Sequence, residues 1–366
     1  MTTLAEELTI APLTVPAALD AADAADFLAY AELNRRVCAH DAGLPELAPS
    51  AQEMLPDWLD ATDRLQLGFV ARRQGRLVGV ASMTLAQEDG STTGESDVLI
   101  EPDAWSTAWG PRAAAALLAA LEDEARRRGR TSLQTWTLHR PGSADRTLIP
   151  ATGWGRVAAT ELSETLESAG YRLEQVERNS EFDLQGDTAG LEKRLASALA
   201  SAGPDYRVVA WTLPTPPEHQ DGYAQVLSRL ATDVPSGDLA IDEERWDAAR
   251  VRRRDRRFAD SGQTVSVAAV QHVPTSALVA YNELVIGPDL TGVTHQFGTL
   301  VRKEHRGHRL GTIVKCANLL RWRSIAPASP KVSTFNAEEN RPMLDINEAL
   351  GFVPVSYTGA WQKRLS

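Results

Sequence analysis

The two halves of this 366-residue chain repeat the same order of predicted elements, and this repetition limits the possible folds more than any other feature. Each half reads as helices, a hairpin, a strand, a tight turn, a long helix, a strand, a short helix, a Gly-aromatic pair and final strands. Residues 109–114 (WGPRAA) align with residues 306–311 (RGHRLG), and the later SAGYRLEQV aligns with ALGFVPVSY. We therefore predict a tandem duplication of one α/β unit.

The first copy has a longer interval between its turn and its Gly-aromatic pair, and the extra residues fall in HRPGSADRTLIPATGWGR. A polar-flanked helical stretch over residues 185–205 separates the copies. We predict an N-terminal domain over residues 1–185, a helical connector over residues 186–205 and a C-terminal domain over residues 206–366.

Residues 301–322 contain the most informative local pattern, which reads as a strand end, a basic turn and a long amphipathic helix. QFGTLV is rich in β-branched and apolar residues and predicts the strand. The following helix repeats apolar residues at helical spacing. A glycine-containing turn at a helix start leaves backbone N–H groups unpaired at the positive end of the helix dipole. This arrangement predicts a site for a phosphate or pyrophosphate.

Composition narrows the possible classes of protein and partner. The chain is 43% apolar and 24% charged, as in globular proteins, and its net charge of −11 argues against nucleic acid as the main partner. We find no apolar stretch of about 20 residues that could span a membrane, and no secretory signal in MTTLAEELTIAPLTVP. Cys38 and Cys316 fit buried, reduced thiols better than a disulfide or a metal site. We expect a cytoplasmic protein without a metal.

The second half resembles the GNAT superfamily of acyl-CoA-dependent N-acyltransferases. The family's phosphate turn, Arg/Gln-x-x-Gly-x-Gly/Ala, follows a strand that ends Val-x-x-x-x-Arg, and Val301, Arg306 and Gly311 fit this frame. The family also carries an Asn eleven residues before a Gly-Phe pair, which Asn340 and the pair at 351–352 match. Both motifs lie within residues 206–366. An intact copy paired with a degenerate one is similar to two-domain actinobacterial members such as mycothiol synthase.

The resemblance implies an α/β (α+β) fold of two tandem GNAT-like domains. Each would be a mixed, mostly antiparallel twisted sheet flanked by helices, and a splayed strand pair would bind CoA in the C-terminal copy. The first copy departs from the motif because Trp109 replaces the arginine, Pro111 removes an N–H donor from the turn and Ala159 replaces the asparagine. We expect the first copy to act as a scaffold.

The resemblance also implies roles for individual residues, with acetyl-CoA as co-substrate. The expected cofactor-binding residues are Leu300, Val301, Arg306, Gly307, His308, Arg309, Leu310, Gly311, Thr312 and Asn340. A backbone N–H near Val301 would bind the thioester oxygen in the transition state. Two positions depart from the family. Arg309 stands where glycine is usual, which predicts that it avoids positive φ, and Asn347 stands where many members place a tyrosine as general acid.

A general base is needed because most amines are protonated at neutral pH. His295, at the start of the strand, is one candidate because a histidine side chain ordinarily titrates near neutrality, although it could instead be a strand-end histidine bonded to a loop. Glu283, on the neighbouring hairpin strand, is the second candidate and is equally explained as an ordinary paired carboxylate. The arginine-rich stretch 250–257 predicts a solvated, salt-bridged helix face.

These inferences predict an acyltransferase that moves an acetyl group from acetyl-CoA to a primary amine of a small molecule. The amine would attack directly in a ternary complex. We expect no nucleic-acid or membrane partner, and either a monomer whose halves form a pseudo-dimer or a homodimer. Two alternatives stay open. The enzyme could use a hydroxyl acceptor or a longer acyl-CoA, or the chain could be a CoA-binding regulatory or sensing module without turnover.

Overall fold

The structure is a computed structural model, and it describes residues 8–142 and 144–365. These residues form two compact units, and neither unit is continuous in sequence. Unit 1 takes its described residues from Met1–Glu177, Ser236–Asp242 and Ser356–Ser366, and unit 2 consists of Arg178–Pro235 and Glu243–Val355. Residues 356–365, predicted to lie in the C-terminal domain, are part of unit 1.

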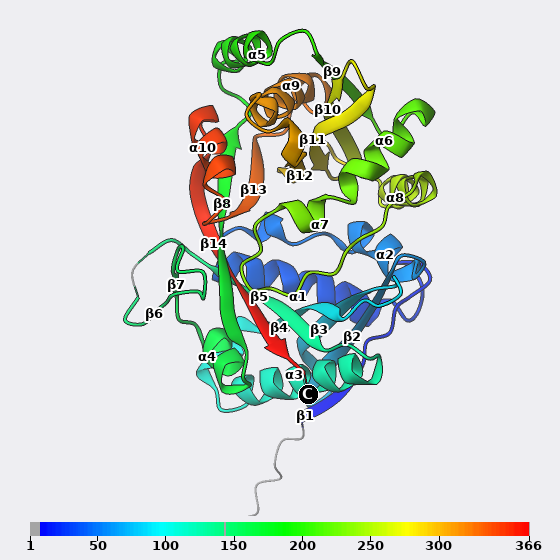
Figure 1. The fold of residues 1–366 in the computed structure, drawn as a ribbon. Coiled ribbons are helices and arrows are strands. Elements are labelled where there is room, and N and C mark those ends of the chain that lie inside the picture. The colour runs from blue at the N-terminus through cyan, green and yellow to red at the C-terminus, as the bar shows by residue number, and fades with distance from the viewer. Residues whose placement is uncertain (1–7, 143, 366) are drawn as a thin grey trace, which may run out of the picture. The chain divides into compact units, whose positions relative to one another are not determined.

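Unit 1 contains a mixed sheet with the strand order β1-β2-β3-β4-β5-β14-β8 (Figure 1). Its strands are β1 (Leu8–Pro12), β2 (Arg64–Arg73), β3 (Arg76–Ala86), β4 (Thr93–Ile100) and β5 (Ser132–His139), with most of β14 (Val353–Arg364) and the first half of β8 (Arg172–Asp183), whose remaining residues belong to unit 2. Strands β4 and β5 are parallel, whereas β14 is antiparallel to β5. A separate two-stranded ribbon, β6 (Thr147–Leu148) and β7 (Val157–Ala158), lies in the segment where the sequence predicts extra residues.

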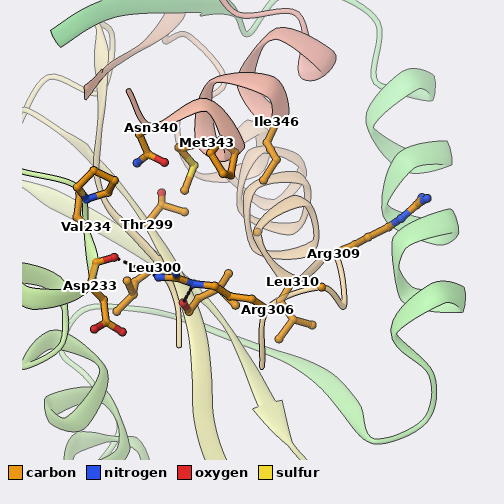
Figure 2. Close-up of a pocket in the computed structure, with 15 residues that line it drawn as sticks. Asp233, Val234, Thr299, Leu300, Arg306, Arg309, Leu310, Asn340, Met343 and Ile346 are labelled. Atoms are coloured by element: carbon orange, nitrogen blue, oxygen red, sulfur yellow. Dashed lines mark hydrogen bonds between the residues drawn. The ribbon is translucent and has the colours of Figure 1, made fainter. Parts of the chain in front are cut away.

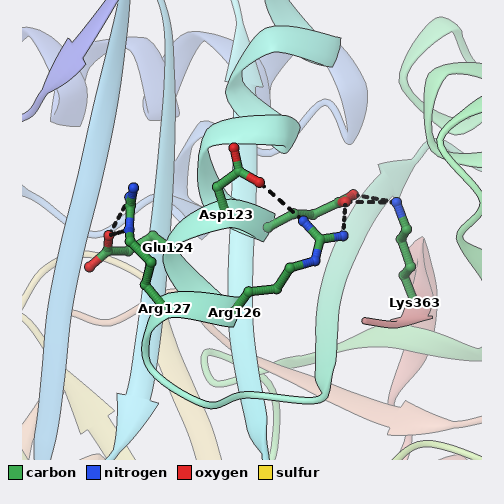
Figure 3. A network of polar contacts seen from close by, with 6 residues as sticks. Asp123, Glu124, Arg126, Arg127 and Lys363 are labelled. Atoms are coloured by element: carbon green, nitrogen blue, oxygen red, sulfur yellow. Dashed lines mark hydrogen bonds and ion pairs between the residues drawn. The ribbon is translucent and has the colours of Figure 1, made fainter. Parts of the chain in front are cut away.

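Helices cover both faces of this sheet. They are α1 (Ala25–Asp41), α2 (Ala51–Leu59), α3 (Gly110–Arg127) and α4 (Glu161–Ser168), with short 3-10 turns at Pro45–Leu47 and Pro102–Ser106. One core joins α3 and α4 to the sheet and contains Trp361 of β14, and a second core joins α1 and α2 to the other face. Lys363 of β14 also binds the buried Glu122 carboxylate of α3 at 2.7 Å (Figure 3). Strand β14 is thus part of the unit 1 core.

Unit 2 repeats this architecture with the strand order β8-β13-β12-β11-β10-β9. Its further strands are β9 (Tyr206–Thr212), β10 (Thr264–His272), β11 (Ala277–Ile286), β12 (Thr294–Val301) and β13 (Lys331–Ala337). Its helices are α5 (Ala189–Ala202), α6 (Pro217–Leu227), α7 (Leu230–Asp233), α8 (Ala248–Asp260), α9 (Leu310–Ile325) and α10 (Arg341–Leu350). Helices α6 and α8 pack on one face, while α5 and α9 pack on the other.

Two irregularities of β12 shape the centre of unit 2. The parallel register between β12 and β13 contains only Thr294↔Val332 and His295↔Ser333, so the strands separate beyond these pairs. The antiparallel register with β11 shifts between Asn282 and Leu284, where residues 297–298 of β12 lie opposite one residue of β11. This two-against-one arrangement is a β-bulge. The predicted α/β class and the predicted splayed strand pair are both confirmed.

Other expectations concern burial. Cys38 and Cys316 are buried free thiols, as predicted. Within residues 8–142 and 144–365, every helix is too short or too polar to cross a lipid bilayer.

Candidate active site

A basic turn joins β12 to α9 and leaves the first N–H groups of the helix open. The turn begins with a 3-10 segment, η3 (Lys303–His305), and then passes through two left-handed residues. Gly307 has a φ of 87° and Arg309 a φ of 56°. Arg309 is the N-cap of α9, and no side chain caps this helix. The N–H groups of the first helical turn therefore suit an anion.

The expectation that Arg309 avoids positive φ is wrong. A non-glycine residue in the left-handed region costs of the order of 1 kcal/mol, which the surrounding packing must offset. The next residue, Leu310, is 2% exposed and packs in the core beside Ile313, so it fixes the direction of the chain. In Figure 2 the Arg309 side chain extends away from Arg306 and the other labelled residues. The turn therefore holds Arg309 in the left-handed conformation, and the Arg309 side chain points away from the other residues labelled in Figure 2.

A cavity of about 410 Å³ lies beside this turn, between the end of β12 and the starts of α9 and α10 (Figure 2). All of the predicted cofactor-binding residues line it except His308 and Thr312. His308 instead packs against the Tyr206 ring, with 5.1 Å between the ring centroids. The wall also contains residues outside the predicted set, namely Asp233, Val234, Pro235, Thr299, Pro342, Met343 and Ile346.

Gly311 keeps the cavity open where α9 approaches α10. A Cβ at this position would lie 3.0 Å from Ile346 Cδ1 and 3.7 Å from Val301 Cγ2. Both of these residues line the cavity. A branched side chain at position 311 would therefore occupy space inside it.

Arg306 crosses one wall of the cavity (Figure 2). Its guanidinium donates to the carbonyl oxygen of Val301 at 3.3 Å and to that of Asp233 at 3.1 Å. The Asp233 carboxylate in turn pairs with Lys303 at 3.0 Å. These contacts hold the end of α7 against the basic turn, so residues 233–235 form part of the wall.

Asn340 and Asn347 have different surroundings, although both lie near α10. The Asn340 side-chain amide lines the cavity and makes no hydrogen bond to any residue in the described part of the chain. Asn347 is 1% exposed, and its amide donates to Asn336 Oδ1 at 2.7 Å. Asn347 does not line the cavity, so it stands apart from the space that a ligand could occupy.

Glu283, one of the two predicted bases, lies in a buried polar cluster between β11, α6 and α8. Its carboxylate is 2% exposed, pairs with the Arg254 guanidinium at 2.8 Å and accepts a hydrogen bond from the Tyr223 hydroxyl. Burial, followed by the nearby Glu283 carboxylate, raises the pKa of Tyr223 and of Tyr281 well above 10. Both phenols therefore stay protonated at neutral pH.

This cluster corrects the prediction for the arginine-rich stretch. Arg254 belongs to it and is mostly buried, and Arg250 is 4% exposed with its guanidinium stacked 4.3 Å above the Trp246 ring. Helix α8 therefore does not present all its arginines to solvent.

His295, the other predicted base, lies on β12 opposite Val285 of β11 and Ser333 of β13. It is half-buried and does not line the cavity. It occupies the last pair of the β12–β13 register, at the point where these strands begin to separate.

A second, more polar cavity of about 540 Å³ lies between α6, α7 and residues 243–246. Its charged lining residues are Arg229, Glu243, Glu244, Arg245 and Arg302, and Trp246 lies among them. In the ranges 8–142 and 144–365, no cluster of His, Cys, Asp or Glu side chains could hold a metal ion.

In unit 1, the corresponding turn at residues 109–114 packs closely against other parts of the protein. Trp109 at the start of α3 packs under the Arg73 guanidinium, whose carbon lies 5.2 Å from the ring centroid. Pro111 occupies the first turn of α3. Gly110 lies so close to the Ala104 carbonyl that a Cβ would clash with it.

Comparisons with known proteins find solved structures with a similar fold. No protein-family model and no curated protein matches the chain. Among solved structures, the chain is similar to a tandem GNAT protein from the clavulanic acid biosynthesis pathway, with 24% identity, a TM-score of 0.70 and coverage of 98% of this chain and 99% of that one.

A GCN5-related N-acetyltransferase from Sphaerobacter thermophilus is also similar, with 13% identity, a TM-score of 0.59 and coverage of 98% and 96%. These similarities show a shared fold over almost the whole length of the chain.

Proposed function

We propose that this chain, which has the tandem GNAT fold, is an acyl-CoA-dependent N-acetyltransferase that acts on a primary amine of a small molecule. One observation carries the proposal. The uncapped start of α9, the end of β12 beyond its last pair with β13 and the uncommitted Asn340 amide all border one mostly apolar cavity. An anion site beside a mostly apolar cavity fits the pyrophosphate and pantetheine arm of CoA.

The pyrophosphate would bind the N–H groups that follow Gly307, where the helix dipole favours negative charge. Beyond His295, β12 has no register partner on β13, so its backbone groups on that edge lack a strand to pair with. The pantetheine amides would take the place of that strand. An N–H group near Val301 or Leu300 would then bind the thioester oxygen and stabilise the negative charge of the tetrahedral intermediate.

The amine nitrogen would attack the thioester carbonyl carbon, and the carbon–sulfur bond would break with its electron pair leaving on the CoA thiolate. The nitrogen loses a proton in this step. We propose that His295, where β12 and β13 begin to separate, accepts this proton through a water molecule, because it does not line the cavity. The Glu283 carboxylate is buried in an ion pair with Arg254, so we do not assign this role to it. Asn347 has no acidic proton, so the thiolate would take its proton from water.

Calorimetry with CoA and acetyl-CoA, followed by a thiol-release assay with a panel of amines, tests this function. We expect binding of both ligands and acetyl-dependent thiol release with at least one amine. Binding without release for every amine and hydroxyl acceptor would favour a CoA-sensing module. Absence of CoA binding would refute the proposal.

Two variants test the location of the site. Gly311→Val fills the cavity and Arg306→Ala removes the cation beside the turn, so the double variant should lose CoA affinity. Arg207→Ala removes an exposed arginine of β9 that pairs with Gln271, and it serves as a control that should bind CoA normally.

A further inference from the structure

A chain of hydrogen-bonded polar side chains, buried in its middle, crosses unit 2 and ends at the cavity. It begins at Arg321 of α9, whose guanidinium donates to Ser266 Oγ of β10 at 3.2 Å. Ser266 Oγ donates to Asn318 Oδ1 of α9 at 2.7 Å. Asn318 Nδ2 donates to Asn282 Oδ1 of β11 at 2.8 Å, and Asn282 Nδ2 donates to Thr299 Oγ1 of β12 at 2.8 Å. Ser266, Asn282 and Asn318 are fully buried.

The direction of these hydrogen bonds is fixed at Asn318. Its Nδ2 also faces the backbone carbonyl oxygens of Ser266 and Asn282, both at 3.1 Å. Rotating the amide by half a turn would place its own oxygen against these acceptors, and each of them would lose the hydrogen bond from Asn318. An arginine can only donate, so Ser266 Oγ accepts from Arg321, and its own hydrogen is left to donate to Asn318 Oδ1.

This direction determines what Thr299 can do. Because Asn282 Oδ1 accepts from Asn318, Asn282 must present its NH₂ group to Thr299. The Thr299 oxygen therefore accepts a hydrogen bond inside the protein, and its own hydrogen must point elsewhere. The Thr299 hydroxyl donates to no group in the described residues, and Thr299 lines the cavity.

We propose that Thr299 donates a hydrogen bond to a carbonyl oxygen of the bound acyl-CoA, and that Asn282 is the positioning residue that turns this donor into the cavity. The inference deepens the proposed function and rests on it. Two carbonyl sources share this chemistry, namely a pantetheine amide and the thioester itself. Thr299 directly follows the bulge of β12, and in Figure 2 its hydroxyl points toward the side of the cavity where Asn340 lies.

Thr299→Val keeps the shape of the side chain and removes the hydroxyl, whereas Thr299→Ser keeps the donor. We expect the valine variant to lose affinity or rate and the serine variant to retain both. If the acceptor is a pantetheine amide, Thr299→Val should weaken CoA and acetyl-CoA binding equally, by about fivefold to tenfold. If it is the thioester, CoA affinity should be unchanged and kcat should fall by about a hundredfold.

Thr294→Val is the matched control on the same strand. Its hydroxyl is buried and bonds to Trp322 Nε1 at 2.7 Å and to Ser329 Oγ at 2.8 Å, away from the cavity lining. This variant should lose thermal stability while retaining affinity for CoA. The comparison separates a ligand contact from a general loss of packing in β12.

Asn282→Asp tests the direction of the chain without touching the ligand. A carboxylate at position 282 can still accept from Asn318, but it would also accept from Thr299, whose hydrogen would then turn inward. We expect the same fold-loss as for Thr299→Val, and no further loss in the double variant. If the buried carboxylate prevents folding, the valine and serine variants still decide the question.

The outcomes distinguish this inference from the proposed function. A wild-type protein that binds no CoA would refute both. A wild-type protein that binds CoA, together with a Thr299→Val variant of unchanged affinity and kcat, would overturn only the role of Thr299. Equal losses for the valine and serine variants would also overturn it, because the serine retains the donor.

Discussion

Lys315 places an amine in the interior of unit 2. The side chain is fully buried, and its Nζ has no hydrogen-bond partner in the part of the chain that the structure describes. It lies 5.7 Å from the centroid of the Phe352 ring, which offsets part of the cost of burial. Burial lowers the pKa of Lys315 from 10.5 to about 7. Lys315→Met keeps a side chain of similar length and removes the titrating group.

The direction in which stability changes with pH follows from proton binding at Lys315. Between pH 7 and pH 10.5 the unfolded chain binds a proton at Lys315 that the folded chain does not, so the stability of the wild type rises with pH. Each unit of pKa difference corresponds to about 1.4 kcal/mol, and the full interval to roughly 5 kcal/mol. Below both pKa values the two states bind the proton equally, and the penalty is constant.

We therefore expect Lys315→Met to be more stable than the wild type by about 4 kcal/mol at neutral pH, with an advantage that shrinks by about 1.4 kcal/mol per pH unit as the pH rises. Urea unfolding at several values between about pH 7 and pH 10 measures both curves. Lys193→Met, at an exposed position of α5, is the control and should run parallel to the wild type. If the stability of Lys315→Met also ran parallel to that of the wild type across this pH range, the inference that the buried amine of Lys315 lowers stability at neutral pH would be refuted.

Three further substitutions test other parts of the structure. Gly298→Ala would place a Cβ 2.8 Å from Tyr281 Cζ and in contact with its hydroxyl, so unit 2 should lose about 1–3 kcal/mol of stability in denaturant unfolding, partly restored by Tyr281→Phe. Arg254→Met leaves the Glu283 carboxylate buried without its cation and should cost about 3–5 kcal/mol, whereas adding Glu283→Gln should recover much of this loss. Trp361→Ala removes a 1% exposed ring from the core of unit 1, and thermal unfolding should show a loss of about 3–5 kcal/mol; an unchanged transition would contradict the assignment of β14 to that unit.

Much of the architecture could be predicted because the signals are local. Apolar periodicity and a glycine-containing turn predict the strand, turn and helix around Arg306, and the repetition of this order predicts two α/β units. The left-handed conformation of Arg309 could not be predicted, because it depends on the packing of the buried residue that follows it. A run of charges also has the same pattern whether its members are solvated or, like Arg254, paired inside the protein.

The chain of hydrogen bonds that ends at Thr299 could not be predicted from the sequence either. Its members come from β10, β11, β12 and α9, and Asn282 and Asn318 lie far apart in the sequence. An isolated asparagine on a strand or helix carries no sign of its partner. The direction of a hydrogen bond emerges only when all the acceptors around it are known.

The placement of β14 in unit 1 affects how the chain folds during translation. Domains usually fold in the order of synthesis, at about 5–20 residues per second. In this chain the edge of β5 pairs with Tyr357–Arg364, and the core of unit 1 requires Trp361. The first unit must therefore hold an open strand edge during translation of the whole second unit, for roughly ten to forty seconds at these rates. Until then it is exposed to the non-native strand pairing that finished sheets avoid.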